Sequence, residues 1–458
     1  MKYTFDAVVV GAGQAGPSLA VRLAGAGRKV GFVERKLFGG TCVNAGCTPT
    51  KAMVASAHAA QLARRAQDYG VKAGPVSIDL AAVMARKDAI VLKSRQGVEK
   101  WLRDTKNCTV FTGTAAFESA KTLRVGDDLL EAENIFLNVG ARPAIPKMPG
   151  VDSAPFLTST SILELKDLPR HLVVVGGGYV GLEFAQMFRR FGSEVTVVDR
   201  KPRLAMHEDE DASAAIREIL EAEGIQVRVN ACCIHLEQRA GEIAVGLECR
   251  EGEPHVLGSH VLLAVGRTPN THDLNLAAAG VKANESGYIE VDDELRTSAP
   301  GIYAIGDCNG RGAFTHTSYN DFEIVADNLL QGAKRRVSDR IPASALYIDP
   351  PLAHIGLSES EVRKQGKRVL VGMRPMTRIA RAIEKGETYG FIKIFVDADT
   401  QQILGATVFG VGGDEAIHCI LTAMYAKQPA SLLTHSVHIH PTVAELIPTT
   451  LEDLKPLE

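Results

Sequence analysis

Two cysteines at a short spacing, Cys42 and Cys47, are the residues of this chain with the clearest capacity for chemistry. They lie in an uncharged stretch between Gly39 and Lys51, directly after a glycine-rich nucleotide-binding signature. Neighbouring thiols can cycle between a dithiol and a disulfide, and so carry a pair of electrons. A dithiol beside a dinucleotide site therefore indicates an oxidoreductase in which electrons pass through sulfur.

The spacing of Cys42 and Cys47 does not suit a disulfide within one ideal helix. At a rise of about 1.5 Å per residue their α-carbons would lie more than about 7.5 Å apart, beyond the roughly 7 Å limit for a disulfide. We therefore expect a distorted turn, which Gly46 and Pro49 permit, followed by a helix over about 51–66. Both sulfurs would then lie near a helix N-terminus, which favours the thiolate.

The first dinucleotide-binding motif begins at residue 11. Residues 5–10 predict a buried strand that continues into a G-x-G-x-x-G sequence and a helical stretch, and a second predicted strand, residues 29–33, ends in an acid. Glycines in this pattern let the backbone approach a pyrophosphate at the helix N-terminus, and the acid binds ribose hydroxyls. The residues of this motif are Gly11, Gly13, Gly16 and Glu34.

The same motif recurs in the middle of the chain. Residues 172–175 and 194–198 predict strands on either side of a helix, and an acid follows the first glycine at the same distance as in the first copy. Two copies in register favour two nucleotide sites over two chance glycine-rich turns. Residues 138–143 and 264–269 are also similar to each other, which supports a duplication. The residues of the second motif are Gly176, Gly178, Gly181 and Asp199.

Together, these motifs resemble the pyridine nucleotide-disulfide oxidoreductases, the flavoprotein family of glutathione reductase, dihydrolipoamide dehydrogenase and mercuric reductase. The resemblance covers nearly the whole chain and implies that the first motif binds FAD and the second a nicotinamide nucleotide. It makes Cys47 the flavin-facing sulfur that forms the charge-transfer thiolate, and Cys42 the exposed interchange sulfur that attacks the substrate. Lys51 matches a family lysine near flavin N5, paired with a glutamate that is Glu183 here.

A thiol relay needs a proton acceptor with a pKa near neutrality, and histidine supplies one. The segment from His440 to Glu445 resembles the family's C-terminal motif, in which the histidine is the base toward the interchange thiol and the glutamate orients its ring. The resemblance implies a homodimer whose active sites are shared across the interface, with His440 donated by the other subunit. A metal cluster of His435, His438 and His440 is the alternative, although no cysteine or carboxylate completes a ligand set.

The resemblance also implies further cofactor contacts. Asp307 is expected at the flavin ribitol, and Tyr179 matches a tyrosine that covers the flavin until nicotinamide displaces it. Asp199 favours NADH because a carboxylate repels a 2′-phosphate, whereas Arg200 and Arg203 could bind that phosphate, so NADPH stays open. The other expected cofactor-binding residues are Gly40, Thr41, Lys51, Gly140, Gly266 and Gly306.

The predicted fold class is α/β, with two Rossmann-like dinucleotide-binding domains and a C-terminal α+β dimerisation domain. A chain of 458 residues is too long for one core, because single cores stop growing at about 250 to 300 residues. The predicted domains are a discontinuous FAD-binding domain (1–150 and 272–335), an NAD(P)-binding domain (151–271) and a dimerisation domain (340–458).

Composition excludes several kinds of partner. A net charge of -3 carries no basic excess that would attract nucleic acid or an anionic membrane. No run of about 18 apolar residues is present, so we expect a cytoplasmic protein without a membrane partner. Only Cys42 and Cys47 have a spacing with an obvious redox meaning. The adjacent Cys232 and Cys233 lie in a strand-like run, where we expect them to be buried.

The electron acceptor is the least determined property. Residues 306–308 resemble mercuric reductases, and residues 313–321 together with 439–445 resemble a mercuric-reductase-like subgroup that includes the reactive-chlorine resistance flavoprotein, a copper(II) reductase. The chain has no cysteine after Cys419, where mercuric reductases carry an extra pair, so we do not expect mercuric reductase activity. The sequence predicts an FAD-dependent NAD(P)H reductase of a small disulfide, quinone or soft metal ion. The alternatives are a dihydrolipoamide dehydrogenase and a non-enzymatic redox-sensing flavoprotein.

Overall fold

The computed structural model describes residues 1–239, 241–248 and 253–458. These residues form two compact units, which are described in turn. Unit 1 contains residues 1–52, 82–144 and 266–340, and unit 2 contains residues 53–81, 145–265 and 341–458.

Unit 1 is built on a sheet in the strand order β3-β2-β1-β6-β5-β4, and β17 also pairs with β6. Strand β1 is parallel to both of its neighbours, and Val8 and Val9 are fully buried in it. Such continuous apolar burial is typical of a parallel strand covered on both faces. The strands are β1 (Lys2–Val10), β2 (Val30–Glu34), β3 (Cys108–Thr112), β4 (Ala115–Ser119), β5 (Thr122–Val125), β6 (Asp128–Leu137) and β17 (Ile302–Ala304).

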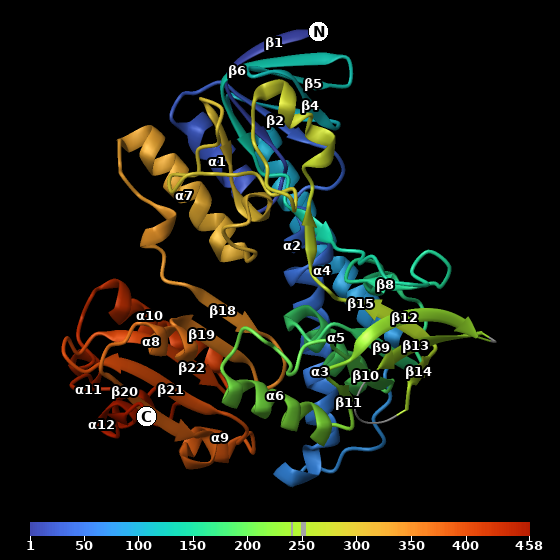
Figure 1. The fold of residues 1–458 in the computed structure, drawn as a ribbon, viewed down its shortest axis with the longest axis vertical. Helices are drawn as coiled ribbons and strands as arrows, with labels where there is room; N and C mark the ends of the chain where they lie inside the picture. The colour runs from blue at the N-terminus through green and yellow to red at the C-terminus, as the bar shows by residue number, and fades with distance from the viewer. Residues whose placement is uncertain (240, 249–252) are drawn as a thin grey trace. The chain divides into compact units, whose positions relative to one another are not determined.

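Helices α1 (Ala15–Gly25) and α7 (Thr315–Gln331) lie side by side against this sheet (Figure 1). Leu19 of α1 and Val325 of α7 share one apolar cluster with Phe32 of β2. The cofactor motif between β1 and α1 is therefore fixed at the carboxyl edge of the sheet, where nucleotides bind in such folds.

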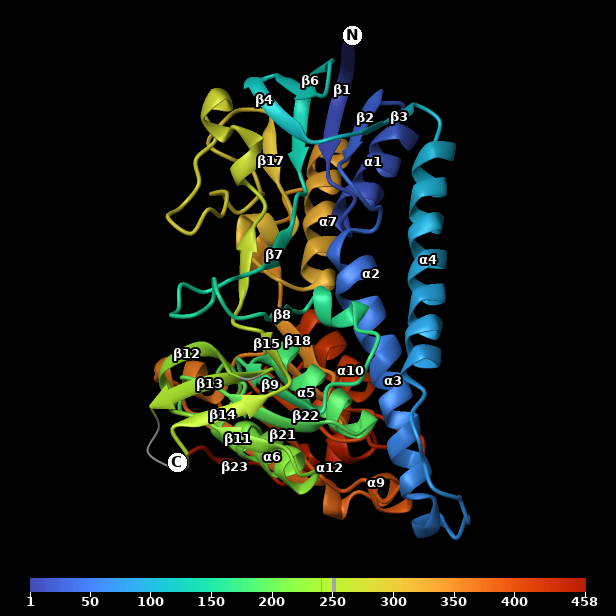
Figure 2. The same ribbon diagram turned by 90° about the vertical axis from the view of Figure 1, so that its right-hand side faces the viewer.

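A second group of helices in unit 1 carries the cysteines. These are α2 (Gly40–Ala45), α3 (Cys47–Arg64), which begins in unit 1, and the long α4 (Leu80–Asp104). Helix α4 runs beside α2 and the start of α3 (Figure 2), because Arg95 donates to Asn44 Oδ1 at 2.7 Å and Arg86 donates to the Ala52 carbonyl at 2.7 Å. A short ladder joins β7 (Ala141–Pro143) to β16 (Arg267–Pro269).

Unit 2 contains a second parallel sheet, in the order β11-β10-β9-β15-β8. Helix α5 (Tyr179–Phe191) follows β9, and its buried side chains, including Leu182, Ala185 and Phe188, recur at helical spacing. The strands are β8 (Leu157–Thr158), β9 (His171–Val175), β10 (Glu194–Val198), β11 (Gln226–Arg228) and β15 (His260–Leu263), and α6 (Glu210–Ala222) lies between β10 and β11 in the chain.

An antiparallel ribbon of β12 (Cys232–Arg239), β13 (Glu242–Glu248) and β14 (His255–Gly258) is attached to this part of unit 2. Cys232 and Cys233 at its start are both exposed, so the expectation that they are buried is wrong. The physical reason is a β-bulge between Cys232 and His235, which interrupts the alternation of inward and outward side chains.

The C-terminal part of unit 2 is an antiparallel sheet in the order β18-β19-β22-β21-β20-β23. Ile392, Ile394 and Val408 on its inner face share one apolar cluster with Ile417 and Ile420 of α10. The strands are β18 (Ala343–Leu346), β19 (Leu352–Gly356), β20 (Val369–Pro375), β21 (Phe391–Asp397), β22 (Ile403–Phe409) and β23 (Lys455–Pro456). The helices are α8 (Glu359–Lys364), α9 (Ala380–Glu384), α10 (Gly413–Tyr425), α11 (Ser431–Thr434) and α12 (Leu446–Glu452).

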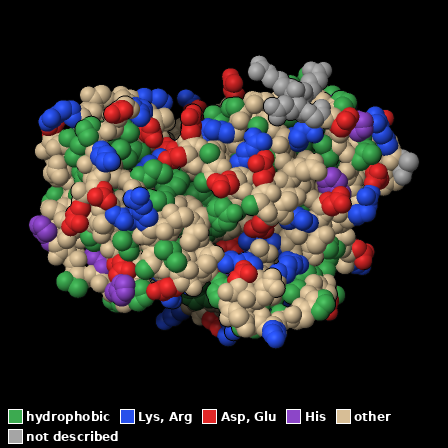
Figure 3. Space-filling model, turned by 90° about the horizontal axis from the view of Figure 1, so that it is seen from below, with side chains coloured by type: hydrophobic (Ala, Val, Ile, Leu, Met, Phe, Trp, Pro, Cys, Tyr) green, Lys and Arg blue, Asp and Glu red, His purple; other side chains and the backbone are tan. Residues whose placement is uncertain are grey.

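Acidic and basic side chains are interspersed over the face shown in Figure 3, without a large area of one sign. Within the described residues, no helix has the length and apolarity needed to cross a membrane.

Short 3-10 helices complete the fold: Ala66–Tyr69, Ser161–Glu164, His272–Leu274, Leu276–Ala279, Gly306–Asn309, Val337–Asp339 and Met376–Arg378.

Candidate functional site

The first glycine motif forms a turn that only glycine can occupy. Gly11 has a φ of 107°, and a Cβ at this position would lie 2.3 Å from the Asn138 carbonyl oxygen. A Cβ at Gly16 would lie 2.2 Å from the Gly11 carbonyl oxygen. The side chain of Asn138 braces the turn by donating to the Gly11 carbonyl at 2.9 Å. This close approach of backbone to backbone is the geometry that a dinucleotide-binding turn requires.

The second glycine motif repeats this construction in unit 2. Gly176 has a φ of 117°, and a Cβ there would lie 2.4 Å from the Ala264 carbonyl oxygen. A Cβ at Gly181 would lie 2.0 Å from the Gly176 carbonyl oxygen, whereas Gly178 faces open space. The turn is therefore packed on one side and open at Gly178, where a pyrophosphate could approach the N-terminus of α5.

The acid of each motif is bonded to the turn of its own copy. Glu34 accepts hydrogen bonds from the backbone of Ala12 and Lys36, both at 2.8 Å. Asp199 accepts equivalent bonds from the backbone of Gly177 at 2.5 Å and Lys201 at 2.8 Å. The two sites thus share an internal geometry as well as a sequence pattern, and the binding of ribose by these acids stays a prediction.

The cysteine-bearing helix α2 begins directly on the first glycine turn. Gly40, its first residue, has a φ of 59°, and a Cβ there would lie 2.7 Å from the Gly13 α-carbon. The hydroxyl of Thr41, the next residue, lies 3.4 Å from the Ala141 carbonyl oxygen. Because a side chain at Gly40 would separate the two segments, glycine is needed to place the dithiol beside the FAD motif.

The helix is interrupted between the two cysteines, as expected. Gly46 has φ -139° and ψ -122°, which ends α2, and α3 starts at the next residue. The helix therefore begins at Cys47, earlier than the predicted start near Lys51. Pro49 fits within the first turn of α3, where a helix does not need the missing N–H.

A single hydroxyl contacts both sulfurs. Thr315 Oγ1, at the first residue of α7, lies 3.1 Å from Cys42 Sγ and 3.3 Å from Cys47 Sγ. The hydrogen bond of Cys42 to Cys47, its partial burial and the charge of Cys47 all raise the pKa of Cys42, and Thr315 opposes that rise. These surroundings therefore favour the thiol form of Cys42 over its thiolate.

The exposure of the cysteines differs from the expectation. In this single chain Cys47 is exposed and Cys42 is partly buried, so the expected exposure of Cys42 is not observed. Thr315 is also a residue that sequence reasoning missed as a sulfur contact. Thr315 lies more than 250 positions along the chain from both cysteines, so no local sequence pattern links it to them.

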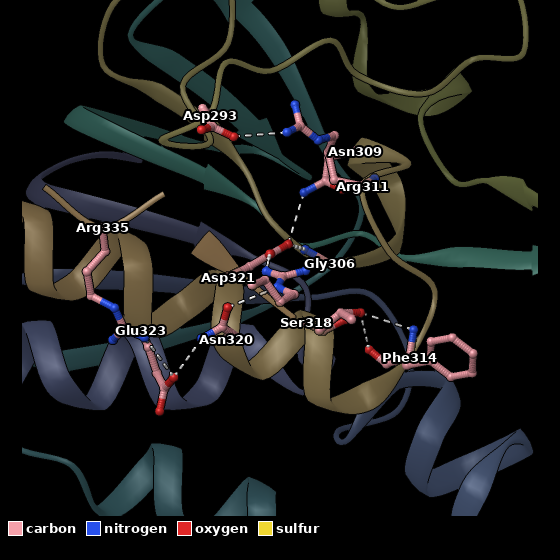
Figure 4. A network of polar contacts seen from close by, with 12 residues as sticks. Asp293, Gly306, Asn309, Arg311, Phe314, Ser318, Asn320, Asp321, Glu323 and Arg335 are labelled. Atoms are coloured by element: carbon pink, nitrogen blue, oxygen red, sulfur yellow. Dashed lines mark hydrogen bonds and ion pairs between the residues drawn. The ribbon is translucent and has the colours of Figure 1, made fainter. Parts of the chain in front are cut away.

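Asp307 lies in a turn that a buried acid holds in place. Burial raises the pKa of Asp307, and the Arg267 guanidinium, with Nε 3.4 Å from Oδ2, opposes that rise. Asp321, which is 2% exposed, accepts hydrogen bonds from the Gly306 backbone at 2.8 Å and from Asn309 at 3.0 Å (Figure 4). Sequence reasoning gave Asp321 no role, yet it fixes the turn that presents Asp307.

The similar segments that end the two nucleotide motifs pair with each other. The ladder of β7 and β16 joins Arg267 to Pro143 and Pro269 to Ala141. Gly140 and Gly266 precede these strands with φ values of 65° and 125°, and each faces open space. A Cβ added at either glycine would have no neighbouring protein atom within 4 Å, so both turns are open at these positions.

Tyr179 is the first residue of α5, immediately after the second glycine turn. Its hydroxyl donates to the carboxylate of the buried Glu208 and lies 3.3 Å from Ser344 Oγ. Burial, with the nearby Glu208 carboxylate, raises the pKa of Tyr179, so the phenol stays protonated.

The two arginines after the second acid differ in their surroundings. The Arg203 guanidinium donates to the Glu208 carbonyl at 2.5 Å, whereas Arg200 is exposed.

Glu183 is 5% exposed on α5 and accepts a hydrogen bond from the Tyr347 backbone at 3.0 Å. Lys51 lies in the first turns of α3 and is partly buried. The two residues belong to different units, and their pairing stays a prediction.

His440 is oriented by Glu445, as expected of a catalytic pair. Its Nδ1 lies 2.9 Å and 3.1 Å from the two carboxylate oxygens of Glu445, which fixes the proton on Nδ1 and leaves Nε2 as the proton acceptor. The side chain of His440 is 74% exposed, and its neighbours Val437 and Ile439 are exposed as well. No group of three or more potential metal ligands is present among the described residues, so His435, His438 and His440 do not form one.

Comparison with known proteins agrees with this geometry. Residues 5–321 match the family described as pyridine nucleotide-disulphide oxidoreductase, and residues 342–451 match its dimerisation domain. The probable pyridine nucleotide-disulfide oxidoreductase RclA of Escherichia coli (strain K12) is 36% identical over 450 residues, or 96% of this chain and 97% of that protein. A mercuric reductase of Staphylococcus aureus is 33% identical over 441 residues, or 96% of this chain and 81% of that protein.

Further relatives extend the same picture. A dihydrolipoyl dehydrogenase of Thermus scotoductus is 35% identical over 449 residues, or 96% of this chain and 95% of that protein. The solved structure of a Cu(II) complex of the HOCl-induced flavoprotein disulfide reductase RclA from Escherichia coli matches with a TM-score of 0.90 at 34% identity, covering 98% of this chain and 99% of that one. The predicted fold class and the predicted cofactors, FAD and a nicotinamide nucleotide, are confirmed. The chain therefore belongs to the pyridine nucleotide-disulfide oxidoreductase family and is a flavoprotein enzyme that uses FAD and NAD(P)H.

Proposed function

We propose that this enzyme uses NAD(P)H to reduce a small disulfide, quinone or soft metal ion through Cys42 and Cys47. The observation that carries the proposal is the position of the dithiol. Helix α2, which contains Cys42, begins at Gly40 against the first glycine turn, and the Thr315 hydroxyl contacts both sulfurs. FAD bound at Gly11, Gly13, Gly16 and Asp307 supplies the electron transfer between the nicotinamide and the sulfurs.

The two cysteines have different roles in this proposal. Cys47 is the sulfur on the flavin side and carries the negative charge of the reduced pair, whereas Cys42 holds the proton. The raised pKa of Cys42, caused first by its hydrogen bond to Cys47, supports this division. Cys42 becomes a nucleophile only when a base removes its proton, so attack on the acceptor is coupled to proton transfer.

His440 of the partner subunit is the proposed base for Cys42. Glu445 holds the tautomer in which Nε2 accepts a proton, which is the property that a base toward a thiol needs. The dimerisation domain supports a homodimer, and the exposed Val437 and Ile439 beside His440 suit a surface that a second subunit covers. The pairing of Lys51 with Glu183 is part of the same proposal and would fix the lysine beside the flavin.

The nature of the acceptor is proposed from the named relatives. One solved structure of RclA is a Cu(II) complex, and other relatives are mercuric reductases. Soft metal ions prefer thiolate ligands, which Cys42 and Cys47 provide. A reductase of copper(II) or another thiophilic ion is therefore the first candidate within the proposed acceptor class.

A turnover screen tests the proposal. Purified holoenzyme is assayed with NADH and NADPH against Cu(II), Hg(II), quinones and small disulfides, with Cys42→Ser as the control for thiol-dependent turnover. The proposal expects steady NAD(P)H consumption with at least one acceptor of this class, and its loss in Cys42→Ser. Flavin reduction without turnover on any acceptor would instead support a redox-sensing protein.

A dihydrolipoyl dehydrogenase is the second candidate, because a named relative of this kind is 35% identical over nearly the whole chain. Such an enzyme would oxidise dihydrolipoamide with NAD⁺ at a rate well above its rate with metal ions or quinones. Assay of lipoamide in both directions therefore separates the two candidates.

A further inference from the structure

We propose that Arg95 and Asn44 are positioning residues for Cys42 and Cys47, which hold the segment between the two cysteines and so stabilise their disulfide form. The inference rests on the proposed function in one respect, because it takes these two cysteines as the redox pair. All four residues belong to unit 1. Asn44 lies between the cysteines in the chain, and Arg95 belongs to the long helix α4.

The helix that carries Cys42 needs support from outside itself. Helix α2 is six residues long, and isolated helices shorter than about 12 to 15 residues are marginal in water. Its N-cap is Gly39, which has no side chain that could cap it, and Gly46 ends it in a non-helical conformation. Other contacts must therefore maintain the spacing of the two cysteines.

Asn44 ties α2 to the backbone at its start. Its side-chain amide donates one hydrogen bond to the Phe38 carbonyl and another to the Gly40 carbonyl, both at 2.9 Å. The amide oxygen, Oδ1, accepts a hydrogen bond from Arg95 Nε at 2.7 Å. Both N–H donors of the amide are therefore used, and its oxygen is bound as well. The side chain of Asn44 thus fixes the fold of the segment that separates the two sulfurs.

The contact with Arg95 determines which way this amide points. The nitrogen and the oxygen of an amide have similar shapes but opposite hydrogen-bonding roles. A flipped amide would turn its oxygen toward two carbonyl oxygens and its nitrogen toward a guanidinium, which only donates. A hydrogen bond from a charged donor is also about twice as strong as a neutral one. Arg95 therefore selects the orientation in which Asn44 holds α2.

Arg95 itself is carried by an element that is fixed in the core of unit 1. Helix α4 has 25 residues, and its fully buried Leu102 shares one apolar cluster with Phe32 and Phe38. Val91, one turn before Arg95 on the same helix, is also buried. The side chain of Arg95 is partly buried. The core of unit 1, through α4, therefore sets the position from which Arg95 contacts Asn44.

A fixed segment favours the disulfide because two thiols that are already held close lose little conformational freedom when they join. Thr315 Oγ1 lies 3.1 Å from Cys42 Sγ and 3.3 Å from Cys47 Sγ, so both sulfurs are held at one hydroxyl. Without the contact of Arg95, the reduced segment would sample more conformations, and oxidation would have to order it again. Loss of Arg95 should therefore shift the pair toward the dithiol, which is a higher reduction potential.

Equilibration of the holoenzyme with reduced and oxidised dithiothreitol tests the proposal. Each disulfide that forms between Cys42 and Cys47 takes two electrons and two protons from the enzyme and converts one oxidised dithiothreitol to its dithiol. The reduced fraction of the pair is measured by alkylation and mass spectrometry, without NAD(P)H or an acceptor. We expect Arg95→Leu to lower the equilibrium constant for disulfide formation about two- to tenfold, as for the loss of one hydrogen bond. Arg95→Lys, which keeps a charged donor, should recover part of the loss.

Two further variants separate this role from general support of the fold. Arg86 on the same helix also donates at 2.7 Å, but to the Ala52 carbonyl of α3, so Arg86→Leu should leave the equilibrium constant unchanged. Asn44→Ala should lower the constant by itself. Adding Arg95→Leu to Asn44→Ala should then have no further effect, because both residues act through one contact.

An unchanged or higher equilibrium constant in Arg95→Leu would overturn the inference. Equal losses in Arg95→Leu and Arg86→Leu, or additive losses in the double variant, would do the same. If wild type forms the disulfide and Arg95→Leu matches it, this inference alone fails. A wild type that forms no disulfide between Cys42 and Cys47 at any ratio of the reagents would contradict the proposed function, and this inference with it.

Discussion

At the scale of single residues, the chemistry of this enzyme depends on what surrounds two sulfur atoms. Thr315 contacts both of them, and the raised pKa of Cys42 follows from its hydrogen bond to Cys47 and its burial. A hydroxyl that donates to sulfur stabilises the thiolate over the thiol. Thr315 is therefore expected to assist whichever sulfur carries the charge at each stage.

The substitution Thr315→Val tests this contact because it removes the hydroxyl and nearly preserves the volume. A hydrogen bond of this kind contributes about 0.5 to 1.5 kcal/mol, so kcat/KM should fall about two- to tenfold. The pH at which the interchange thiol becomes reactive, measured from the pH dependence of iodoacetamide alkylation of the reduced enzyme, should move upward. Thr105→Val, at an exposed hydroxyl that bonds to the Trp101 carbonyl, is the matched control and should change neither quantity. An unchanged alkylation profile in Thr315→Val would contradict the assigned role.

At the scale of elements, helix α3 begins at Cys47 and carries the exposed His58, which joins an ionic network with Asp349 and Arg190. His58 Nδ1 lies 2.9 Å from Asp349 Oδ2, and Arg190, which is 6% exposed, lies 2.6 Å from the same carboxylate. Burial alone would raise the pKa of Asp349, but His58 and Arg190 outweigh it and lower the pKa to about 2. The carboxylate therefore stays charged and anchors the second half of α3 within unit 2.

This anchor predicts a pH-dependent contribution to stability. The hydrogen bond to Asp349 raises the pKa of His58 above its ordinary value of 6.5, so the folded state binds this proton more tightly than the unfolded state. The contribution is present in full below about pH 6.5 and is lost as the pH rises through the higher folded-state pKa. The difference in thermal midpoint between wild type and His58→Gln should be largest near pH 6 and decline as the pH rises through the folded-state pKa of His58. The control, His418→Gln at an exposed position of α10, should show no such trend, and a difference that grows with pH would contradict the assignment.

The sequence predicted regular elements well and long-range contacts poorly. The predicted strands at residues 172–175 and 194–198 agree with β9 and β10, because apolar runs and glycine turns are local signals. The predicted start of α3 and the predicted burial of Cys233 were wrong. Each depends on one unusual backbone conformation, which lies at Gly46 for α3 and at the bulge for Cys233. Thr315 and Asp321 were not identified because their importance arises from partners brought together only by the fold.

At the scale of the whole molecule, the proposed active site needs two chains. The family match to a dimerisation domain supports a homodimer, and His440 is exposed in a single chain beside apolar side chains that are also exposed. We do not expect a catalytic base to remain this exposed to solvent. We also expect the exposed apolar side chains beside it to be covered by a partner. Covering by a second subunit accounts for both features.

Subunit complementation tests this arrangement. Cys42→Ser and His440→Ala homodimers should each be nearly inactive. In a mixed dimer, one site combines both defects, and the other combines an intact dithiol with an intact histidine. Random mixing of equal amounts should therefore restore about a quarter of wild-type turnover. Absence of any recovery in a sample shown to contain mixed dimers would place the base on the same chain as the dithiol.

We propose that NAD(P)H reduces a disulfide between Cys42 and Cys47 and that Cys47 is the sulfur on the flavin side, which anaerobic reduction of the enzyme can test. One equivalent of NAD(P)H is added to oxidised holoenzyme while long-wavelength absorbance is recorded and reactive thiols are counted. We expect two new thiols and a long-wavelength band in wild type, a band that persists in Cys42→Ser, and no band in Cys47→Ser. Equal spectra for the two variants, or no gain of thiols in wild type, would contradict it.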